Sequence, residues 1–318
     1  MPRLPSPFDP ILQQQGFVML DGGLASELEF RGAVLDDALW SAKVLLEQAD
    51  TIRQLHLDYF LAGADVAISA SYQATYEGLA QKGLGEAASD TIFQKSIALA
   101  QAARDQYVQQ QAGKSNRLPP LVAASIGPYG AFLADGSEYR GDYGISKSAL
   151  VDFHRNRLQK LLEFQPDILA VETIPCLIEA EAIIQLLSES PSTKAYLSFS
   201  CRDGQYLSSG ESFAAAVALA HSCPQVVAVG INCTAPHLIS PLLSSVQASS
   251  ALPFVVYPNK GESWDAHRKC WVPADSSSSI KDKVEEWYDL GGRVFGGCCR
   301  VRPADIAEMR RKLERVCA

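Results

Sequence analysis

The sequence predicts an α/β protein folded as a single (β/α)8 barrel of the TIM type. Three observations lead to this prediction. Short apolar runs recur eight times along the 318 residues, segments with helical spacing separate them, and no charged run or flexible linker divides the chain. Apolar strands that alternate with helices are typical of a parallel sheet covered on both faces, and eight such units in about this length favour a closed barrel.

The eight apolar runs are the expected strands. They cover residues 17–20, 66–69, 121–124, 168–171, 195–199, 226–231, 254–256 and 293–295. The alternative is a doubly wound open sheet that binds a dinucleotide. That fold carries a G-x-G-x-x-G pattern after its first strand, whereas Asp21-Gly22-Gly23-Leu24 has a different spacing. The barrel is therefore the favoured architecture.

Helices are expected between the strands. Apolar residues share one face over 52–62, after a candidate N-cap at Asp50, and again over 150–162. Pro303 suits the first turn of the last helix, whose apolar face extends to Val316. Five further helices are expected at 90–110, 177–188, 212–221, 236–246 and 280–290. The proline-rich segment 1–16 is expected to be an arm before the barrel domain at 17–318.

Composition and charge exclude several classes of partner. The net charge of −8 disfavours binding to nucleic acid, since acidic proteins repel phosphate backbones. The longest apolar stretches are far shorter than the roughly 18 residues that span a bilayer, and no targeting segment is recognised at the N-terminus. We therefore expect a cytoplasmic protein that does not bind membranes, with its eight cysteines present as reduced thiols.

Reactive side chains follow several of the expected strands. In a barrel of this type the chemistry lies at the carboxyl ends of the strands, so these residues are considered together. They are Asp21, Ser125, Glu172, Thr173, Asn232, Cys233, Tyr257, Cys298 and Cys299. Cys233 follows the sixth strand, and the other two cysteines follow the eighth. The fold therefore directs three thiols toward one end of the barrel axis.

Three thiolates with one open position describe a catalytic zinc site. The spacing between Cys233 and Cys298 forms no motif, so reduced core thiols and a single cysteine nucleophile remain alternatives. One rival is a metal-independent hydrolase in which His237 activates Cys233 or Cys299. A second is a zinc ion with a purely structural role. The other five cysteines, at 176, 201, 223, 270 and 317, are interpreted as incidental.

The carboxylates at the strand ends suit a cationic substrate group. Glu172 is expected to point into a partly buried cleft, where a substrate ammonium group is a natural partner. The competing interpretation pairs Glu172 with a neighbouring arginine. Asp21, which precedes two glycines, has the alternative role of organising a tight turn.

Motifs along the whole chain resemble those of the homocysteine S-methyltransferase family. They are Leu20-Asp21-Gly22-Gly23, Ser69-Ala70-Ser71-Tyr72-Gln73, Ser125-Ile126-Gly127-Pro128-Tyr129-Gly130, Glu172-Thr173-Ile174-Pro175, Gly230-Ile231-Asn232-Cys233 and Gly296-Gly297-Cys298-Cys299-Arg300. The resemblance implies a zinc-dependent (β/α)8 barrel. It implies that zinc is bound by Cys233, Cys298 and Cys299, and that the amino-acid part of homocysteine is held by Asp21 and Glu172, with Ser125, Thr173 and Asn232 beside them.

The segment from Asp135 to Tyr143, together with Tyr257-Pro258-Asn259, is similar to the branch of the family that uses S-methylmethionine or S-adenosylmethionine. Only 19 residues follow Cys299, which disfavours the betaine-using and cobalamin-dependent branches. Trp40, Tyr129 and Tyr139 are candidates for cation–π contact with a sulfonium donor. The segment 258–279 is interpreted as a lid or an exposed insertion.

The sequence thus predicts a cytoplasmic, zinc-dependent methyltransferase that makes methionine from homocysteine without cobalamin. Its chemistry would be the attack of a thiolate on the methyl group of a sulfonium, because the thiolate and not the thiol is the nucleophile.

Overall fold

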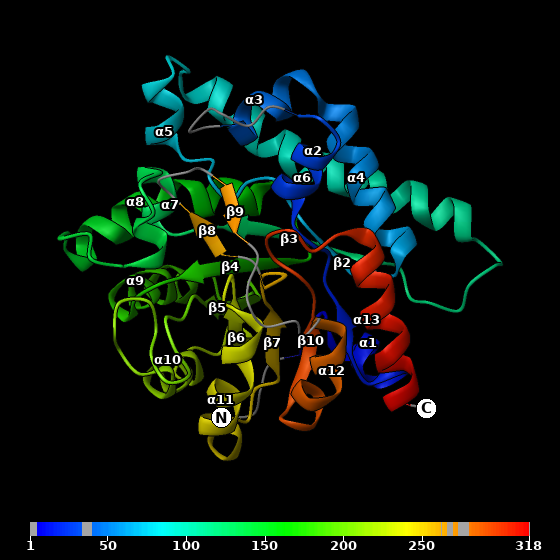
Figure 1. The fold of residues 1–318 in the computed structure, drawn as a ribbon. Helices are drawn as coiled ribbons and strands as arrows, with labels where there is room; N and C mark the ends of the chain where they lie inside the picture. The colour runs from blue at the N-terminus through cyan, green and yellow to red at the C-terminus, as the bar shows by residue number, and fades with distance from the viewer. Residues whose placement is uncertain (1–4, 34–39, 262, 266–269, 273–279, 318) are drawn as a thin grey trace.

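The computed structural model of the chain describes residues 5–33, 40–261, 263–265, 270–272 and 280–317. Eight parallel strands form its central sheet (Figure 1). They are β1 (Val18–Met19), β2 (Val66–Ile68), β3 (Leu121–Ile126), β4 (Ile168–Ile174), β5 (Ala195–Phe199), β6 (Val226–Asn232), β7 (Phe254–Tyr257) and β10 (Gly292–Phe295). Each predicted apolar run coincides with one of them.

The sheet closes on itself. Its hydrogen-bonded order is β1-β10-β7-β6-β5-β4-β3-β2. The two ends of this order meet through a parallel bridge between Leu20 and Val66 and through a 2.6 Å hydrogen bond from the Asp65 amide to the Met19 carbonyl. The predicted (β/α)8 barrel is confirmed, and the open-sheet alternative is wrong.

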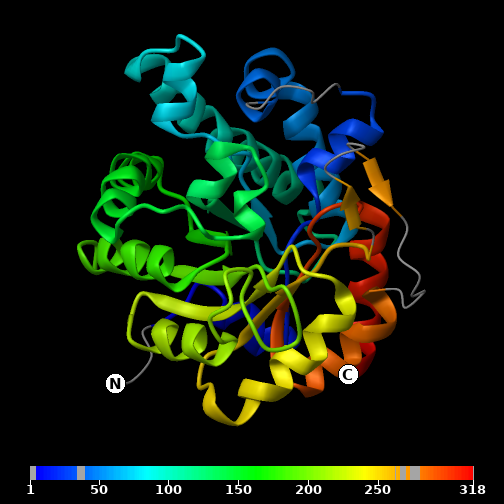
Figure 2. The same cartoon turned by 60° about the vertical axis from the view of Figure 1, so that its left-hand side comes forward.

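Helices surround the barrel (Figures 1 and 2). They are α1 (Asp9–Gln15), α2 (Leu24–Phe30), α3 (Trp40–Glu47), α4 (Ala49–Ala62), α5 (Tyr76–Gln81), α6 (Glu86–Gln111), α7 (Tyr129–Leu133), α8 (Lys147–Glu163), α9 (Leu177–Ser188), α10 (Phe213–His221), α11 (Pro236–Val246), α12 (Ile280–Asp289) and α13 (Pro303–Val316), with the 3-10 turns η1 (Ser137–Tyr139) and η2 (Gln247–Ser249). The predicted helices are all present. The N-cap at Asp50 is wrong, because Gln48 precedes α4 and Asp50 lies in its first turn.

Two apolar clusters stabilise this arrangement. The larger packs the helices against the outer face of the strands, and the smaller fills the barrel with side chains such as Val66, Tyr196 and Val294. Phe8 and Ile11 belong to the inner cluster, and the Phe8 ring lies 6.2 Å from that of Tyr196. The chain before β1 therefore contributes to the core inside the barrel.

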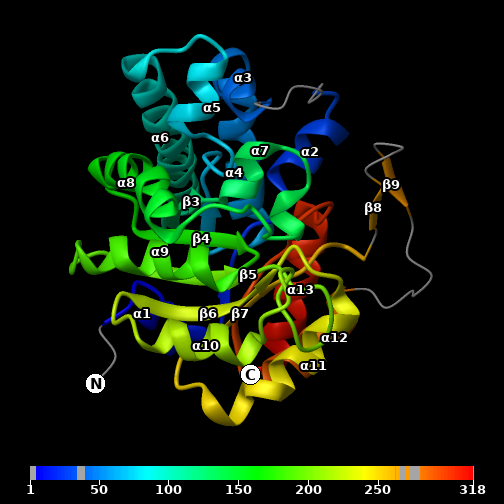
Figure 3. The same cartoon turned by 90° about the vertical axis from the view of Figure 1, so that its left-hand side faces the viewer.

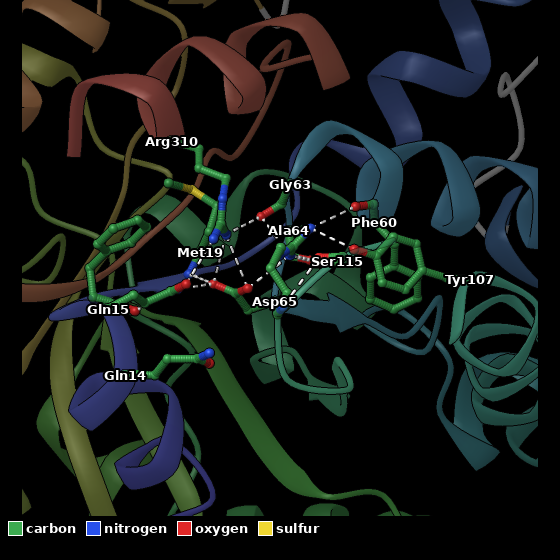
Figure 4. A network of polar contacts seen from close by, with 12 residues as sticks. Gln14, Gln15, Met19, Phe60, Gly63, Ala64, Asp65, Tyr107, Ser115 and Arg310 are labelled. Carbon is green, nitrogen blue, oxygen red and sulfur yellow. Dashed lines mark hydrogen bonds and ion pairs between the residues drawn. The ribbon is translucent and has the colours of Figure 1, made fainter. Parts of the chain in front are cut away.

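A buried carboxylate ties the first and last helices to the start of β2 (Figure 4). Asp65 accepts hydrogen bonds from the Arg117 guanidinium at 2.8 Å, from Arg310 at 3.1 and 3.2 Å, from Gln15 at 2.7 Å and from the Met19 amide at 2.9 Å. Both carboxylate oxygens are therefore satisfied by charged or polar donors, as burial of a charge requires.

A small hairpin lies inside the segment 258–279. Its strands β8 (Ser263–Asp265) and β9 (Cys270–Val272) are antiparallel, with Trp264 opposite Trp271. Figure 3 shows the hairpin standing away from the barrel on the side of α2. The rest of 262–279 lies outside the described residues, so the role of this segment as a lid stays a prediction.

Within the described part of the chain, none of the helices combines the length and the apolar character needed to cross a membrane.

The Asp65 cluster gives a prediction about stability. Replacing Asp65 by Asn should lower the free energy of unfolding by about 3 kcal/mol, because two largely buried arginines would lose their shared anion. Urea denaturation measures this change. The matched control is Asp282→Asn, which removes a carboxylate that pairs with Lys312 and is 56% exposed; its cost should stay below about 1 kcal/mol. Equal costs for both variants would show that the cluster does not stabilise the barrel.

Candidate active site

The predicted site residues meet at the carboxyl ends of the strands. Asp21 follows β1, Ser125 lies in β3, Glu172 and Thr173 lie in β4, Asn232 ends β6 and Cys233 comes next, and the last two cysteines follow β10. Strands β6 and β10 lie on either side of β7 in the sheet (Figure 1), so Cys233 and the cysteine pair come from strands separated by a single strand.

Three cysteine sulfurs form one cluster. The sulfur atoms of Cys233, Cys298 and Cys299 lie within 4.8 Å of one another, and each residue is partly exposed. No fourth Cys, His, Asp or Glu joins this cluster among the residues that the structure describes. The described residues therefore offer three sulfur ligands to a metal ion.

Glycines allow the last cysteine pair to pack against the first strand. The Gly297 amide donates to the Asp21 carbonyl at 3.1 Å, and the Cys298 amide donates to the Pro258 carbonyl at 2.8 Å. A Cβ atom on Gly297 would come within 2.0 Å of the Val301 side chain, so no larger residue fits there. Cys233 itself has a φ of 47°, a left-handed conformation that is costly for a residue with a side chain.

One expectation about these cysteines is wrong. Cys233 and Cys298 form a disulfide, with their Cα atoms 5.5 Å apart, whereas the composition predicted reduced thiols throughout. The physical reason is their proximity, since this Cα separation lies within the range that a disulfide requires. The other six cysteines include Cys299, which is free in the structure.

The chemistry of the cluster fits a thiophilic metal ion once the disulfide is reduced. Thiolates are favoured ligands of zinc and of other soft or borderline metals. Burial, together with the smaller effect of the charges of Glu29, Glu138 and Glu172, raises the pKa of the Cys299 thiol to about 12. A bound cation would reverse this preference, because metal ligation deprotonates a thiol.

Glu172 is held by two hydroxyl groups. Ser125 Oγ donates to one carboxylate oxygen through a short hydrogen bond, and the Tyr257 hydroxyl donates to the other at 3.1 Å. Burial raises the pKa of Glu172 to about 7, while these hydrogen bonds oppose the increase. Among the described residues, Glu172 is therefore hydrogen-bonded to two hydroxyl groups and forms no ion pair with an arginine. The competing interpretation of an arginine pair is wrong.

Asp21 combines a structural contact with a free oxygen. Its Oδ2 accepts a 2.9 Å hydrogen bond from the Ile68 amide, which joins β1 to β2. Its Oδ1 is buried and has no hydrogen-bond partner among the described residues. Burial raises its pKa well above the ordinary value, and the nearby charge of Glu172 contributes. Asp21 is thus available to a cationic group of a ligand.

Thr173 and Asn232 bind each other. The Asn232 amide group donates to the Thr173 hydroxyl at 2.7 Å, and its oxygen accepts from the Thr173 amide at 2.8 Å and from Ser198 Oγ at 2.7 Å. Both residues are buried, so these contacts position the neighbouring Glu172 and Cys233. A direct contact of Thr173 or Asn232 with substrate stays a prediction.

The three aromatic candidates differ in their surroundings. As a whole residue, Tyr139 is 42% exposed. Its hydroxyl group is buried, and this burial, with the nearby charge of Cys299, raises its pKa well above the usual value. Tyr129 begins α7, and its ring packs against those of Phe132, Tyr143 and Phe153. The side chain of Trp40 lies outside the described residues.

Two residues of the family motifs, at the carboxyl end of the barrel, received no specific role from the sequence. Glu138 lies in η1, beside Tyr139, and Tyr72 follows β2. The Tyr72 ring packs against Gly127, where a Cβ atom would lie 2.7 Å from two ring carbons. Both residues occur in motifs that marked the family resemblance, but their residue types alone indicated no specific contact.

Comparison with known proteins agrees with this geometry. A family model described as homocysteine S-methyltransferase matches residues 18–313. The chain is 46% identical over 304 residues to a homocysteine S-methyltransferase from Bacillus subtilis (strain 168), covering 96% of each protein. It also resembles the crystal structure of the homocysteine methyltransferase MmuM from Escherichia coli in two forms, each 45% identical. The match to the oxidized form has a TM-score of 0.88 and includes 97% of this chain. The match to the metallated form has a TM-score of 0.87 and includes 96% of this chain. Both matches include the whole of the MmuM chain.

The elevated pKa of Glu172 gives a prediction about pH. The unfolded chain loses the Glu172 proton near pH 4.5, the ordinary pKa of a glutamate, whereas the folded protein keeps it up to about pH 7. Glu172 therefore contributes stability that is fully present below about pH 4.5 and is lost as the pH rises through about 7. Relative to Glu172→Gln, the metal-free wild type should lose about 3 kcal/mol of unfolding free energy across this interval. Urea denaturation at several pH values measures the difference, and parallel profiles would contradict the prediction.

Proposed function

The chain belongs to the homocysteine S-methyltransferase family, and from this premise we propose that it transfers a methyl group from S-methylmethionine, or from S-adenosylmethionine, to homocysteine, giving methionine. The observation that supports this most strongly is the cluster of three cysteine sulfurs beside Asp21 and Glu172 at the open end of the barrel. A thiol substrate with an ammonium group needs both features.

Cys233, Cys298 and Cys299 would hold a zinc ion. When bound, zinc would lower the pKa of the homocysteine thiol, so that its sulfur reacts as a thiolate at neutral pH. An all-sulfur set of ligands keeps electron density on that sulfur, whereas nitrogen-rich sets are more usual where water is activated. The disulfide between Cys233 and Cys298 must be reduced before this set is complete.

Asp21 and Glu172 would bind the ammonium group of homocysteine. Asp21 offers an oxygen without a partner, and the Glu172 carboxylate is oriented by Ser125 and Tyr257. An ammonium group close to Glu172 would favour its ionised form and lower its pKa from about 7. These contacts fix the amino-acid end of the substrate, so that its sulfur is directed toward the cysteine cluster.

The reaction itself neutralises charge. The thiolate sulfur forms a bond to the methyl carbon, the bond between that carbon and the donor sulfur breaks, and its electron pair returns to the donor. A thiolate and a sulfonium thus become two uncharged thioethers. A water-poor site favours such a step, because separated charges are less well solvated there than in water.

The rival functions lack support. In a cysteine-nucleophile hydrolase, His237 would have to activate Cys233 or Cys299, but His237 is exposed at the start of α11 and the family is one of methyltransferases. A structural zinc site would need a fourth protein ligand, and none joins the cluster in the described residues. The cytoplasmic location and the absence of cobalamin stay predictions.

Replacing a metal ligand tests the proposal. Purified protein is reduced, loaded with zinc and assayed for methionine formation from homocysteine and S-methylmethionine, before and after chelation. Cys298→Ser should lose zinc and lower turnover by more than about 100-fold, since even residues that only orient metal ligands affect affinity or activity by 10–100-fold. The control Cys317→Ser, which alters a free cysteine at the end of α13, should keep both properties. Full activity of metal-free protein, or of Cys298→Ser, would rule out the proposed mechanism.

A further inference from the structure

Three buried side chains of the outer helices form one hydrogen-bonded network. They are His154 and Arg157 of α8 and Glu179 of α9, and each is at most 1% exposed. Arg157 Nη2 lies 2.8 Å from His154 Nδ1, and His154 Nε2 lies 2.8 Å from Glu179 Oε1. This network, called here the Arg157 network, joins a buried cation to a buried anion through one imidazole ring.

The contacts of the Arg157 network determine where the imidazole proton lies. A guanidinium group can only donate hydrogen bonds, so His154 Nδ1 is the acceptor and carries no proton. The neutral ring then has its proton on Nε2, which donates to the Glu179 carboxylate. Burial lowers the pKa of His154, in agreement with a neutral ring. The hydrogen bonds therefore run in one direction, from Arg157 through His154 to Glu179.

Both ends of the Arg157 network hold the loop that follows β3. At one end, Arg157 Nη2 donates to the Gly127 carbonyl at 2.7 Å. At the other end, the Tyr129 amide donates to Glu179 Oε1 at 2.6 Å. Pro128, between these two residues, has no amide proton to donate. The cation thus holds a carbonyl and the anion holds an amide, two residues apart in the chain.

The strand that leads into this loop carries Ser125, which orients Glu172 through the short hydrogen bond from its Oγ. The backbone of Ser125 is fixed from the side of β2. Its amide donates to Ser69 Oγ at 3.1 Å, and its carbonyl accepts from Ser71 Oγ at 2.7 Å. The residues at 127–129 are fixed by the Arg157 network instead. The chain on either side of the Ser125 hydroxyl is therefore held by separate sets of contacts.

We propose that Arg157 is a positioning residue for homocysteine binding, which holds the loop after β3 so that Ser125 keeps Glu172 directed at the substrate ammonium group. The network acts from a distance, since its three side chains are buried. Apolar residues of similar volume often stabilise a fold as well as buried charges do, so stability alone does not account for the network. Its contacts with the loop do. The inference rests on the proposed function and adds a supporting layer to the same site.

Arg157→Lys in the zinc-loaded enzyme tests this role. Lysine keeps the buried positive charge, but its single nitrogen lacks the planar fork that holds the Gly127 carbonyl and His154 together. We expect the Kd of homocysteine, measured by calorimetry, and its KM to rise about tenfold, the size of one lost hydrogen bond to a charged group. The zinc content, the KM for S-methylmethionine and kcat should change less than about twofold, because only ground-state binding of homocysteine is weakened.

The matched control is Arg155→Lys. It makes the same change on the same helix, at an arginine whose side chain is 32% exposed and pairs with Glu189. This variant should bind homocysteine as the wild type does, because an exposed ion pair contributes little and does not contact the loop.

A double-mutant cycle separates positioning from general destabilisation. Ser125→Ala removes the hydroxyl through which Arg157 acts. Adding Arg157→Lys to Ser125→Ala should therefore weaken homocysteine binding by less than about twofold beyond Ser125→Ala alone. A purely structural Arg157 would weaken binding by the same factor in both backgrounds, and that result would overturn the inference.

His154 provides a second pair of variants that does not depend on the folding of Arg157→Lys. His154→Leu removes the link between Arg157 and Glu179 and should weaken homocysteine binding in the same way. His154→Gln should restore most of the affinity, because its amide group can accept from the guanidinium and donate to the carboxylate. An unchanged Kd of homocysteine in His154→Leu, or equal losses in both His154 variants, would contradict the proposal. If the wild type makes no methionine from homocysteine, the proposed function fails instead, so the two failures are distinguishable.

Discussion

The convergence of three cysteine sulfurs at one end of the barrel is the constraint on which the rest of the site depends. Cys233 follows β6 and the Cys298-Cys299 pair follows β10, and these two strands flank β7 in the sheet, so the strand order brings the three sulfur atoms within 4.8 Å of one another. The left-handed backbone of Cys233 and the side-chain-free Gly297 make that approach possible. The same closeness permits the Cys233–Cys298 disulfide, so oxidation and metal binding compete for the same sulfur atoms.

Buried carboxylates supply the second feature of the site. Asp21, Glu172 and Glu138 each have a raised pKa because burial disfavours their charged forms. Asp21 and Glu138 also keep an oxygen without a partner in the described structure. Such groups are costly in an empty site and favourable once a cation arrives. They suit a substrate with an ammonium group, as homocysteine has in the proposed reaction.

The sequence predicted the barrel well because alternating apolar strands and amphipathic helices are repeated signals. It missed short helices such as α2, α5 and α7, which are too brief for a helical period, and it did not resolve the β8–β9 hairpin. Strand ends located the three cysteines, Asp21 and Glu172. The pairing of Thr173 with Asn232 and the unpartnered Glu138 depend on side-chain geometry between distant loops, which no local pattern encodes.

X-ray absorption at the zinc edge, on reduced and zinc-loaded protein with and without homocysteine, tests the three-sulfur arrangement most directly. This arrangement predicts three sulfur neighbours and one lighter atom around zinc in the free enzyme, and four sulfur neighbours after homocysteine is added. A spectrum that does not change on adding homocysteine, or a zinc ion with four protein ligands from the outset, would contradict it.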